Sequence, residues 1–568
     1  MGVHSHQILI VGSGLSGLRA AIEAGSEGLD VAVLSEVYAV RSHSGAAQGG
    51  INASLGNAAD GKDDSWEKHA FDTVKGSDYL ADQDAVEVMT KDAPAIVYEM
   101  EHWGTPFSRT DEGLIAQRPF GGAQFPRTCY ATDITGHALL HTLYERSVKE
   151  KIKFYNEFIV LSIVDDDSRV TGLITLNIAT GEIIPFSADA VIMATGGYGR
   201  IFNTSTNALI NTGSGMGAAY FTGKVPLKDM EFVQFHPTTV YPTNILITEG
   251  ARGEGGYLVN NKGERFMKNY APSKMELAPR DIVSRSIRTE IDEGRGFENE
   301  YVHLDLRHLG AKKIMERLPG IRDICIHFAG LDPIKKPIPI QPGQHYSMGG
   351  IDCNYNGETK LPGLYAAGEC ACVSVHGANR LGGNSLLETI VFGKRAGHFG
   401  SIYVKGNNNK KNSSAIASAE KKIKTNISAL ENSTGSELPA AIRNELKDTM
   451  IKNAGIFRHK DKLEKGLLKV RQLKERYKKI HLLGKTKRFN MDLVRTIELE
   501  SKLELSEAIV NGALKREESR GSHFRTDFPK RNDEKFLKHT LAYFTGEGPR
   551  MEESAVNVNR FKPEERVY

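Results

Sequence analysis

The feature that most constrains the fold is a glycine-rich turn close to the start of the chain. Gln7–Val11 has the pattern of a buried parallel strand, and Gly12-Ser13-Gly14-Leu15-Ser16-Gly17 follows it directly. Leu18–Ala24 favours a helix and Val31–Leu34 a second strand. Glycines at this spacing allow a tight turn and let a pyrophosphate approach the start of the helix. The strand–turn–helix–strand order argues against a chance glycine-rich turn. The sequence therefore predicts a dinucleotide-binding βαβ unit.

Two further segments predict contacts with the same dinucleotide. Ser35 and Glu36 follow the second predicted strand, where the ribose of a bound dinucleotide would lie. Ala190–Met193 is another apolar strand, and it ends in Ala194-Thr195-Gly196-Gly197. This pattern is typical of flavoproteins of the two-dinucleotide type, at the point where the chain returns to the cofactor. A plain strand end is the alternative interpretation. We expect an α/β fold with a Rossmann-like FAD domain.

The stretch Arg41–Gly50 (RSHSGAAQGG) reads as a loop that closes around a cofactor. Small polar residues around a single histidine, followed by paired glycines, make a poor helix or strand. The stretch lies just after the βαβ unit, within reach of the ring of a bound flavin. We interpret His43 as a covalent flavin anchor.

The composition excludes several classes of protein. The chain has 568 residues, enough for several domains, and a formal net charge of +3 that does not indicate a nucleic-acid partner. Five cysteines are too few and too scattered for a disulfide framework, and no four have iron–sulfur spacing. Cys370-x-Cys372 could be half of a metal site, but two core thiols are the preferred interpretation, so we expect no metal. There is no uncharged apolar run of about 20 residues, so no membrane span is expected, and the first strand leaves no room for an export signal.

The chain divides into parts of different character. Residues 236–344 have mixed patterning and many charges, and we assign them to an inserted α+β capping domain. The FAD-binding domain then comprises residues 1–235 and 345–406, mostly helical over 65–155 and with strands near 157–192. An Asn/Lys/Ser-rich linker from about 407 opens a helical domain, 407–530. Residues 531–568 form a polar tail, expected to wrap the body or a partner.

One helix of the helical domain is predicted from apolar residues at 3–4 spacing: Leu463, Leu467, Val470, Leu473, Tyr477 and Ile480. Basic residues outnumber acidic ones between Arg458 and Arg488. A solvated helix face is the preferred interpretation, and docking to an acidic partner or to anionic lipid is the alternative.

Several motifs in one order then identify a family. The chain resembles the flavoprotein subunit of succinate dehydrogenases and fumarate reductases nearly from end to end. The motifs are RSHSGAAQGG at 41–50, EFVQFHPT at 231–238, TEGARGEGG at 248–256, APRD at 278–281, HYSMGG at 345–350, GANRLGGNSLLE at 377–388 and REESRGSHFRTDFP at 516–529.

The resemblance implies an FAD bonded through its 8α carbon to His43. Such a bond raises the flavin's potential, so that it can accept electrons from succinate. Ser214 stands where the family usually has an acidic residue, and its hydroxyl can still form a hydrogen bond. The implied FAD-binding residues are Gly12, Ser13, Gly14, Gly17, Ser35, Glu36, Ser42, His43, Ser44, Ala47, Gln48, Gly49, Gly50, Ala194, Thr195, Gly196, Ser214, Glu369, Ser385 and Leu386.

The resemblance also implies a dicarboxylate site between the FAD and capping domains. Arg380 would grip one carboxylate, and His236, His345 and Thr248 would orient the other end. Arg280 would transfer the proton. Since arginine is a poor base in water, Arg280 would need a relay to solvent, which Glu249 and Arg252 can supply. For Arg280 alone, an ion pair with Asp281 is the alternative.

Partners and direction follow from the same resemblance. Without cluster ligands of its own, the chain implies an iron–sulfur subunit and, indirectly, membrane anchor subunits that handle quinone. It would then be peripheral on the cytoplasmic face of the cell membrane. Gln48 favours succinate oxidation slightly over fumarate reduction. L-Aspartate oxidase is the alternative enzyme, but it lacks a histidine at the position of His43. A non-catalytic flavin module is a further alternative, and the retained substrate residues argue against it.

Overall fold

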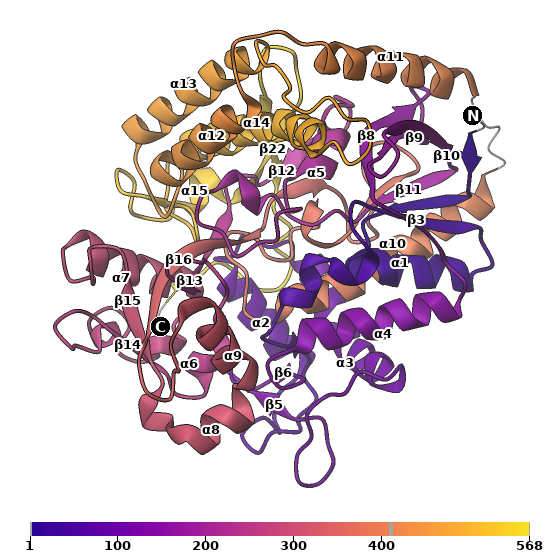
Figure 1. The fold of residues 1–568 in the computed structure, drawn as a ribbon. Helices are drawn as coiled ribbons and strands as arrows, with labels where there is room; N and C mark the ends of the chain where they lie inside the picture. The colour runs from indigo at the N-terminus through magenta and orange to yellow at the C-terminus, as the bar shows by residue number, and fades with distance from the viewer. Residues whose placement is uncertain (1–2, 408–412, 567–568) are drawn as a thin grey trace.

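A five-stranded parallel sheet forms the core of the larger lobe, at the right of Figure 1. The computed structural model describes residues 3–407 and 413–566. Four of the five strands are almost wholly buried and mainly apolar, as expected for a parallel sheet covered on both faces, whereas the edge strand at 153–156 is partly exposed. In spatial order they are β18 (Leu364–Ala366), β11 (Ala190–Met193), β2 (Ile8–Val11), β3 (Val31–Ser35) and β7 (Lys153–Asn156). The predicted βαβ unit and the return strand thus lie side by side in one sheet.

Two helices pack closely on one face of this sheet. They are α1 (Leu15–Ser26) and α10 (Asn384–Gly406), which come from opposite ends of the FAD-binding sequence. A Cβ atom on Gly393 would lie 2.5 Å from the carbonyl oxygen of Ser16, and one on Gly397 would lie 2.5 Å from that of Ala20. Glycine is therefore required for the two helix backbones to approach this closely.

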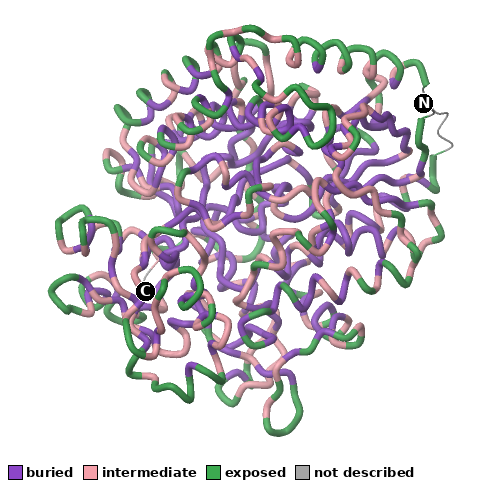
Figure 2. Tube along the Cα trace, in the orientation of Figure 1, coloured by how far each residue is buried: buried purple, intermediate pink, exposed green. Residues whose placement is uncertain are grey.

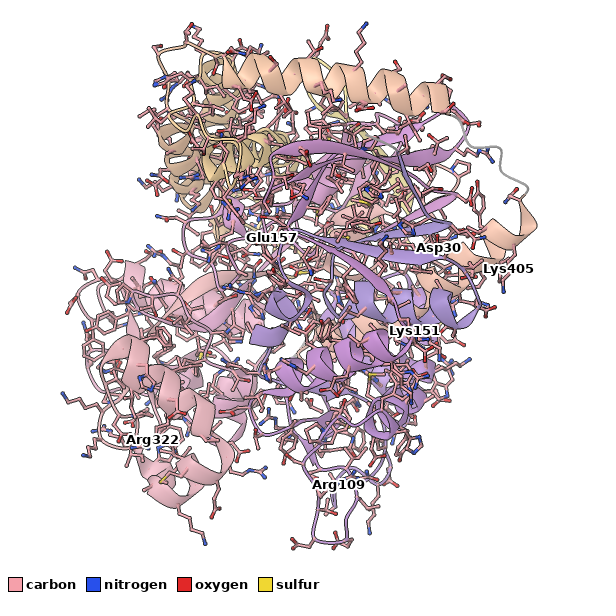
Figure 3. All side chains as sticks on the ribbon, turned by 45° about the vertical axis from the view of Figure 1, so that its right-hand side comes forward. Asp30, Arg109, Lys151, Glu157, Arg322 and Lys405 are labelled. Carbon is pink, nitrogen blue, oxygen red and sulfur yellow. The ribbon has the colours of Figure 1, made fainter. Side chains whose placement is uncertain are left out.

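A second sheet, antiparallel except for the parallel pairing of its edge strand β1, packs near the central one. Its strands are β1 (His4–Ser5), β10 (Glu182–Ser187), β9 (Val170–Asn177) and β8 (Phe158–Asp165), which confirms the strands expected near 157–192. The expectation of a mostly helical stretch from 65 to 155 holds only in part. The helices α2 (Trp66–Gly76), α3 (Gln83–His102) and α4 (Thr135–Lys149) are present, but residues 103–134 form turns and the short strands β5 (Gln117–Arg118) and β6 (Thr128–Cys129). Figure 3 labels Arg109 in this projecting segment.

A second lobe, seen at the lower left of Figure 1, has its own hydrophobic core, with buried residues between Val240 and Ile340. We call this part the cap lobe. Its sheet runs β13 (Val233–Val240), β16 (Ile338–Ser347), β15 (Val302–Asp305) and β14 (Tyr257–Val259), and its helices are α6 (Glu249–Gly253), α7 (Arg280–Asp292), α8 (Gly310–Arg317) and α9 (Pro319–Ala329). Strands β13 and β16 cross the limits expected at 235 and 345, so the division of the chain at these residues stays a prediction.

The C-terminal part is helical, as expected. It contains α11 (Ser413–Glu431), α12 (Pro439–Asn453), α13 (Lys460–Tyr477) and α14 (Met491–Lys515), at the top of Figure 1. The apolar stripe of α13 packs inward through Leu463, Val470 and Leu473, while Ile480 lies beyond the end of that helix. Residues 408–412 of the expected linker lie outside the described part of the chain.

The tail does not only wrap the body. Its strands β22 (Lys538–Tyr543) and β23 (Arg550–Ala555) extend a sheet that also contains β12 (Leu227–Lys228), β17 (Gly350–Asp352) and β19 (Ala371–Cys372). Figure 2 shows the buried interior that these layers enclose and the exposed outer faces of the C-terminal helices. Within the described residues, no helix combines the length and apolar character needed to cross a membrane.

Candidate active site

A cavity of about 840 Å³ lies between the carboxyl edge of the central sheet and the cap lobe. Every residue predicted to bind cofactor or substrate, or to act in catalysis, lines this cavity except Gly17 and Arg252. Gly17 serves the packing of the turn instead, because a Cβ atom there would lie 1.9 Å from the carbonyl oxygen of Gly12. Arg252 lies behind Glu249. The structure thus brings motifs from across the chain to one place.

The glycine-rich turn exposes backbone to the cavity. Gly12 has φ +110°, and a Cβ atom there would lie 2.1 Å from the carbonyl oxygen of Ala194. Gly14 is the N-cap of α1 and provides no side chain to cap the first N–H groups of that helix. These N–H groups and the helix dipole favour a phosphate at this end of the cavity. Ser13 and Ser35 join the first two strand ends by a hydrogen bond of 2.7 Å between their hydroxyls.

The segment that carries His43 is not a plain loop as expected, but two short 3₁₀ turns, Ala39–Arg41 and His43–Ala46. The backbone N–H of Ala208 donates to His43 Nδ1 over 3.3 Å, and the side-chain amide of Asn207 lies 3.4 Å from Nε2. Because Nδ1 is an acceptor, Nε2 is the ring nitrogen that would carry a proton or a substituent. Burial, and secondly the charge of Arg200, lower the pKa of His43 to about 4, so the ring is neutral at pH 7.

The cavity contains polar atoms that need a partner. Ser16 Oγ, Gln48 Oε1, Thr195 Oγ1 and Asn207 Oδ1 are buried and have no hydrogen-bond partner among the described residues. Because such atoms are costly to bury unpaired, they fit a ligand rich in hydrogen-bonding groups, such as FAD. The glycine-rich turn beside them fits the pyrophosphate of the same ligand.

Two carboxyl groups line the cofactor part of the cavity. Burial raises the pKa of Glu369 to about 7, although it accepts a hydrogen bond of 3.0 Å from the N–H of Ser347. Burial, and secondly the neighbouring Glu498, raise the pKa of Glu36 to about 8. Arg495 lies 3.6 Å from Glu36. Protonated or half-protonated carboxyls can donate hydrogen bonds to a sugar, which suits the ribose side of a dinucleotide.

Three charged residues meet at the boundary with the cap lobe. Arg280 begins α7, and its Nε donates to Glu249 Oε2 over 2.7 Å. Arg252, one helical turn after Glu249 on α6, places Nη2 3.9 Å from the same oxygen. Burial would raise the pKa of Glu249, but the charges of Arg280 and Arg252 outweigh it and hold that pKa below its usual value. Glu249 is therefore a carboxylate held between two arginines.

The alternative of an ion pair between Arg280 and Asp281 is wrong. The side chain of Asp281 instead pairs with Arg285 and Arg566, at 3.2 Å each. Arg252 is only 2% exposed, so a relay to solvent through it needs a further residue. It donates to the backbone oxygen of Glu276, whose carboxylate pairs with the exposed Arg265.

The two histidines face each other across the cavity. The rings of His236 and His345 are 4.8 Å apart and edge to face. Burial, followed by the charge of Arg280, lowers the pKa of both rings well below the usual value. The N–H of Thr238 donates to His236 Nδ1 over 3.2 Å, which leaves the proton of that neutral ring on Nε2. Thr248 caps α6 by accepting from the N–H of Gly250.

Gln234 is a site residue that the sequence analysis missed. Its Oε1 accepts from Arg280 Nη1 over 3.2 Å and from Arg380 Nη2 over 3.1 Å. Its Nε2 donates to the side chain of Asn379 and to the backbone oxygen of Arg380. The signal was present, because Gln234 lies two residues before His236 on β13, where alternate side chains share a face. Thr206 was also missed and holds His345 Nδ1 over 2.8 Å.

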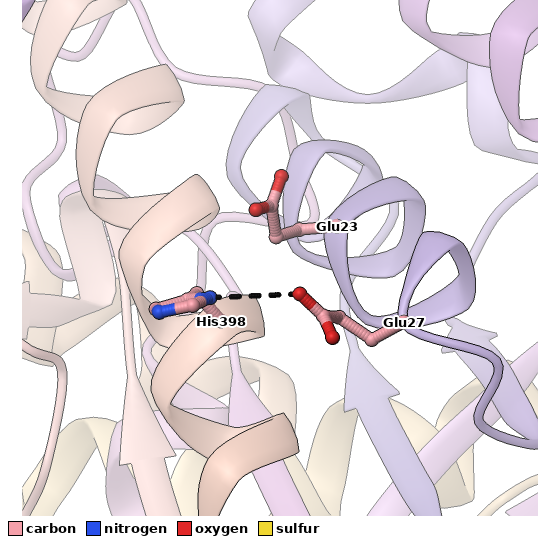
Figure 4. A group of neighbouring side chains, drawn as sticks. All are labelled: Glu23, Glu27 and His398. Atoms are coloured by element: carbon pink, nitrogen blue, oxygen red, sulfur yellow. Dashed lines mark ion pairs between the residues drawn. The ribbon is translucent and has the colours of Figure 1, made fainter.

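Metal binding has little support in the described residues. All five cysteines are buried and free, and Cys370 and Cys372 belong to the core. Glu23, Glu27 and His398 are grouped between α1 and α10 (Figure 4). However, Glu23 already pairs with Arg19 at 2.9 Å, and Glu27 with Lys405 at 2.7 Å. These carboxylates are neutralised by cations of the chain itself.

Comparison with known proteins decides the family. Residues 7–386 match the family described as FAD binding domain, and residues 443–568 match the family described as fumarate reductase flavoprotein C-term. The chain is 45% identical over 559 residues to the succinate dehydrogenase flavoprotein subunit of Rickettsia conorii, covering 95% of this chain and 93% of that one. It is 44% identical to the fumarate reductase flavoprotein subunit of Mycobacterium tuberculosis, covering 99% of both. The chain belongs to the succinate dehydrogenase/fumarate reductase flavoprotein family.

The fold agrees with this membership. A mutant of E. coli quinol fumarate reductase superposes with a TM-score of 0.96 at 41% identity, covering 100% of this chain and 99% of that one. The family resemblance and the two-dinucleotide fold are thereby confirmed, and the chain is an FAD-dependent oxidoreductase. Within this family of flavoproteins, the cavity described above is the natural candidate for the active site.

Proposed function

We propose that the chain interconverts succinate and fumarate, using FAD bonded to His43. The observation that carries this proposal is the convergence of Arg280 and Arg380 on Gln234, beside two neutral histidines, in a buried cavity that His43 also lines. Two guanidinium groups suit a substrate with two carboxylates, because a dianion enters a buried site only when cations and donors replace its water.

At the substrate end of the cavity, charged groups and hydrogen-bond donors would bind the two carboxylates of the substrate. Burial, and secondly the charge of Arg280, lower the pKa of Arg380 to about 9, so Arg380 remains a cation at pH 7. Its face also lies 4.5 Å from the ring of Tyr346, which restricts how it can turn. Arg380 can therefore hold one carboxylate, while His236 Nε2–H and the Thr248 hydroxyl orient the other.

Arg280 is the proposed proton-transfer residue. Its Nε is committed to Glu249 and its Nη1 to Gln234, whereas Nη2 has no hydrogen-bond partner within the described residues. Nη2 can therefore face the substrate carbon that loses or gains the proton. Glu249 and Arg252 continue the path to Glu276 and the exposed Arg265.

Bound FAD would supply the hydride acceptor for succinate oxidation and the hydride donor for fumarate reduction. The chain's part is to hold His43 neutral and oriented. Because Ala208 donates to Nδ1, Nε2 is the nitrogen available to form the covalent bond to FAD. The phosphate-binding turn, Glu36, Glu369 and Ser214 would hold the remainder of the cofactor.

The names of the relatives suggest that this chain works as one subunit of a complex. Its relatives are named as subunits of succinate dehydrogenase and fumarate reductase, so we propose an iron–sulfur subunit as electron acceptor and a membrane anchor beyond it. The chain would then lie on the cytoplasmic face of the membrane. The glutamine at position 48, through the family resemblance alone, favours succinate oxidation slightly.

The test is to purify the native complex and to assay both directions with low- and high-potential dyes. We expect turnover of succinate and fumarate, and a shift of the flavin absorbance on addition of fumarate. A complex that turns over L-aspartate instead would support the aspartate oxidase alternative. A flavoprotein with no spectral response to any dicarboxylate would contradict the proposed function.

A further inference from the structure

The C-terminal tail joins the two lobes beside the substrate site. Arg566 Nη1 lies 3.3 Å from Asp78 Oδ2 and 3.2 Å from Asp281 Oδ2, and its Nη2 lies 3.3 Å from Asp281 Oδ1. Asp78 follows α2 in the FAD-binding body, whereas Asp281 is the second residue of α7 in the cap lobe. One guanidinium group therefore holds a carboxylate of each lobe.

Asp281 is well placed to orient the active site. It follows Arg280 directly, in the first turn of α7. Its Oδ1 also accepts a hydrogen bond of 3.2 Å from Asn379 Nδ2, and Asn379 precedes Arg380. Asp281 is thus the sequence neighbour of Arg280 and also contacts the sequence neighbour of Arg380. A shift of α7 at Asp281 would move Arg280 relative to Arg380.

The tail is anchored before it reaches Arg566. Gln83, at the start of α3, accepts from the backbone N–H groups of Arg560 and Phe561 at 2.8 Å each and donates to the oxygen of Phe561 over 2.7 Å. The ring of Phe561 packs edge to face on Phe71, 5.4 Å away. The tail is therefore fixed to the body, and Arg566 reaches from this anchor to the cap lobe.

The charges of Asp78 and Asp281 explain why the cap lobe would respond to the loss of Arg566. Burial would raise the pKa of Asp78 and of Asp281, but Arg566, the largest of the opposing influences on each, helps to hold both values below the usual one. Asp78 retains Arg531 at 2.8 Å, and Asp281 retains Arg285. Neither of these arginines contacts both carboxylates, so without Arg566 the two buried anions would repel each other across the interface.

We propose that Arg566 is a positioning residue that fastens α7 of the cap lobe to the FAD-binding body and so holds Arg280 in its working position. The consequence for substrate affinity rests on the proposed function, whereas the fastening itself does not. Loss of the bridge lowers the fraction of molecules with the cap lobe in place, and apparent affinity falls in proportion to that fraction.

The experiment compares Arg566→Gln with the wild-type complex. If the fraction with the cap lobe in place falls to about a tenth, the KM for succinate and the dissociation constant of malonate, read from the flavin spectrum, rise about tenfold. The kcat changes much less, because saturating substrate restores the closed arrangement. Hydrogen exchange of the amides of α7 becomes faster in the variant without substrate.

Two further variants make the result decisive. Arg566→Lys keeps the positive charge, but a lysine ammonium cannot bind two carboxylates at once as the guanidinium group does. We therefore expect a rise in KM that is smaller than in Arg566→Gln. This variant also replaces Arg566→Gln in the test if the latter fails to fold. Arg550→Gln removes an arginine of β23 whose side chain is 58% exposed, and should leave KM and exchange unchanged.

The proposal is overturned if Arg566→Gln has wild-type KM, malonate affinity and exchange of α7. It is also overturned if that variant loses only thermal stability or kcat, which would indicate a general structural role. If the wild type binds no dicarboxylate, the proposed function fails, and exchange of α7 alone then decides whether Arg566 fastens the cap lobe.

Discussion

At the scale of single residues, the site depends on how a few charges share their neighbours. Glu249 is a carboxylate between Arg280 and Arg252, and Gln234 accepts from Arg280 and from Arg380. Each arginine therefore has a fixed direction before substrate arrives. This pre-organisation is what the proposed proton transfer by Arg280 requires.

The role of Arg280 predicts a large loss of turnover on substitution. Arg280→Gln retains hydrogen-bonding groups but cannot deliver a proton, so kcat should fall in both directions by roughly 10²- to 10⁴-fold, the usual contribution of general acid–base catalysis. Steady-state assays of succinate oxidation and fumarate reduction measure the loss. Arg288→Gln, which removes an exposed arginine of the same helix paired with Asp292, is the matched control. If Arg280→Gln keeps more than a tenth of the activity, another residue transfers the proton.

Some residues of the site could be predicted from the sequence, and others could not. His236, His345, Arg280 and Arg380 could be assigned because they lie in motifs that resemble those of the family, whereas a lone buried histidine or arginine often has a structural role. Gln234 did not stand out, since an amide is common in any strand and its importance depends on two arginines distant in sequence. The ion pair of Asp281 with Arg566 could not be predicted, because 285 residues separate the partners.

At the scale of secondary-structure elements, the buried side chain of His69 links helix α2 to the start of helix α10. His69 on α2 lies with Nε2 2.9 Å from Asn384 Oδ1, at the start of α10. Burial, and secondly the charge of Arg127, lower the pKa of His69 to about 3. The ring is therefore neutral in the folded protein, and it takes up a proton in the unfolded chain near its ordinary pKa.

This predicts a pH dependence of stability with a definite sign. Because the folded pKa lies below the unfolded one, the stability that His69 contributes is complete above about pH 6.5 and is lost as the pH falls toward about 3. His69→Gln should flatten the decline of the free energy of unfolding by up to about 1.4 kcal/mol per pH unit in this window. Urea unfolding at several pH values measures the slope, with His327→Gln on the exposed side of α9 as control. An unchanged slope in His69→Gln would show that His69 is not buried as a neutral ring.

At the scale of the whole molecule, two lobes with separate cores enclose the site between them. The strands β2, β3 and β11 of the central sheet and helix α1 were predictable, since buried parallel strands and a glycine-rich turn are local patterns. The sheet formed by β12, β17, β19, β22 and β23 was not, because its strands are two to six residues long and the pairing that joins the tail to it, β12 with β22, spans more than 300 positions of the chain. Local sequence does not encode such a pairing, and so the tail was expected to wrap the body without joining a sheet.

The most direct test of the account is whether FAD stays on the chain after denaturation. We predict that the denatured wild-type protein fluoresces at its band on a gel and has the mass of the chain plus FAD, with the modified peptide containing His43. His43→Ser should still bind FAD, give a dark band, and lose succinate oxidation more than fumarate reduction. A dark wild-type band, with all the flavin released into solution, would contradict the account.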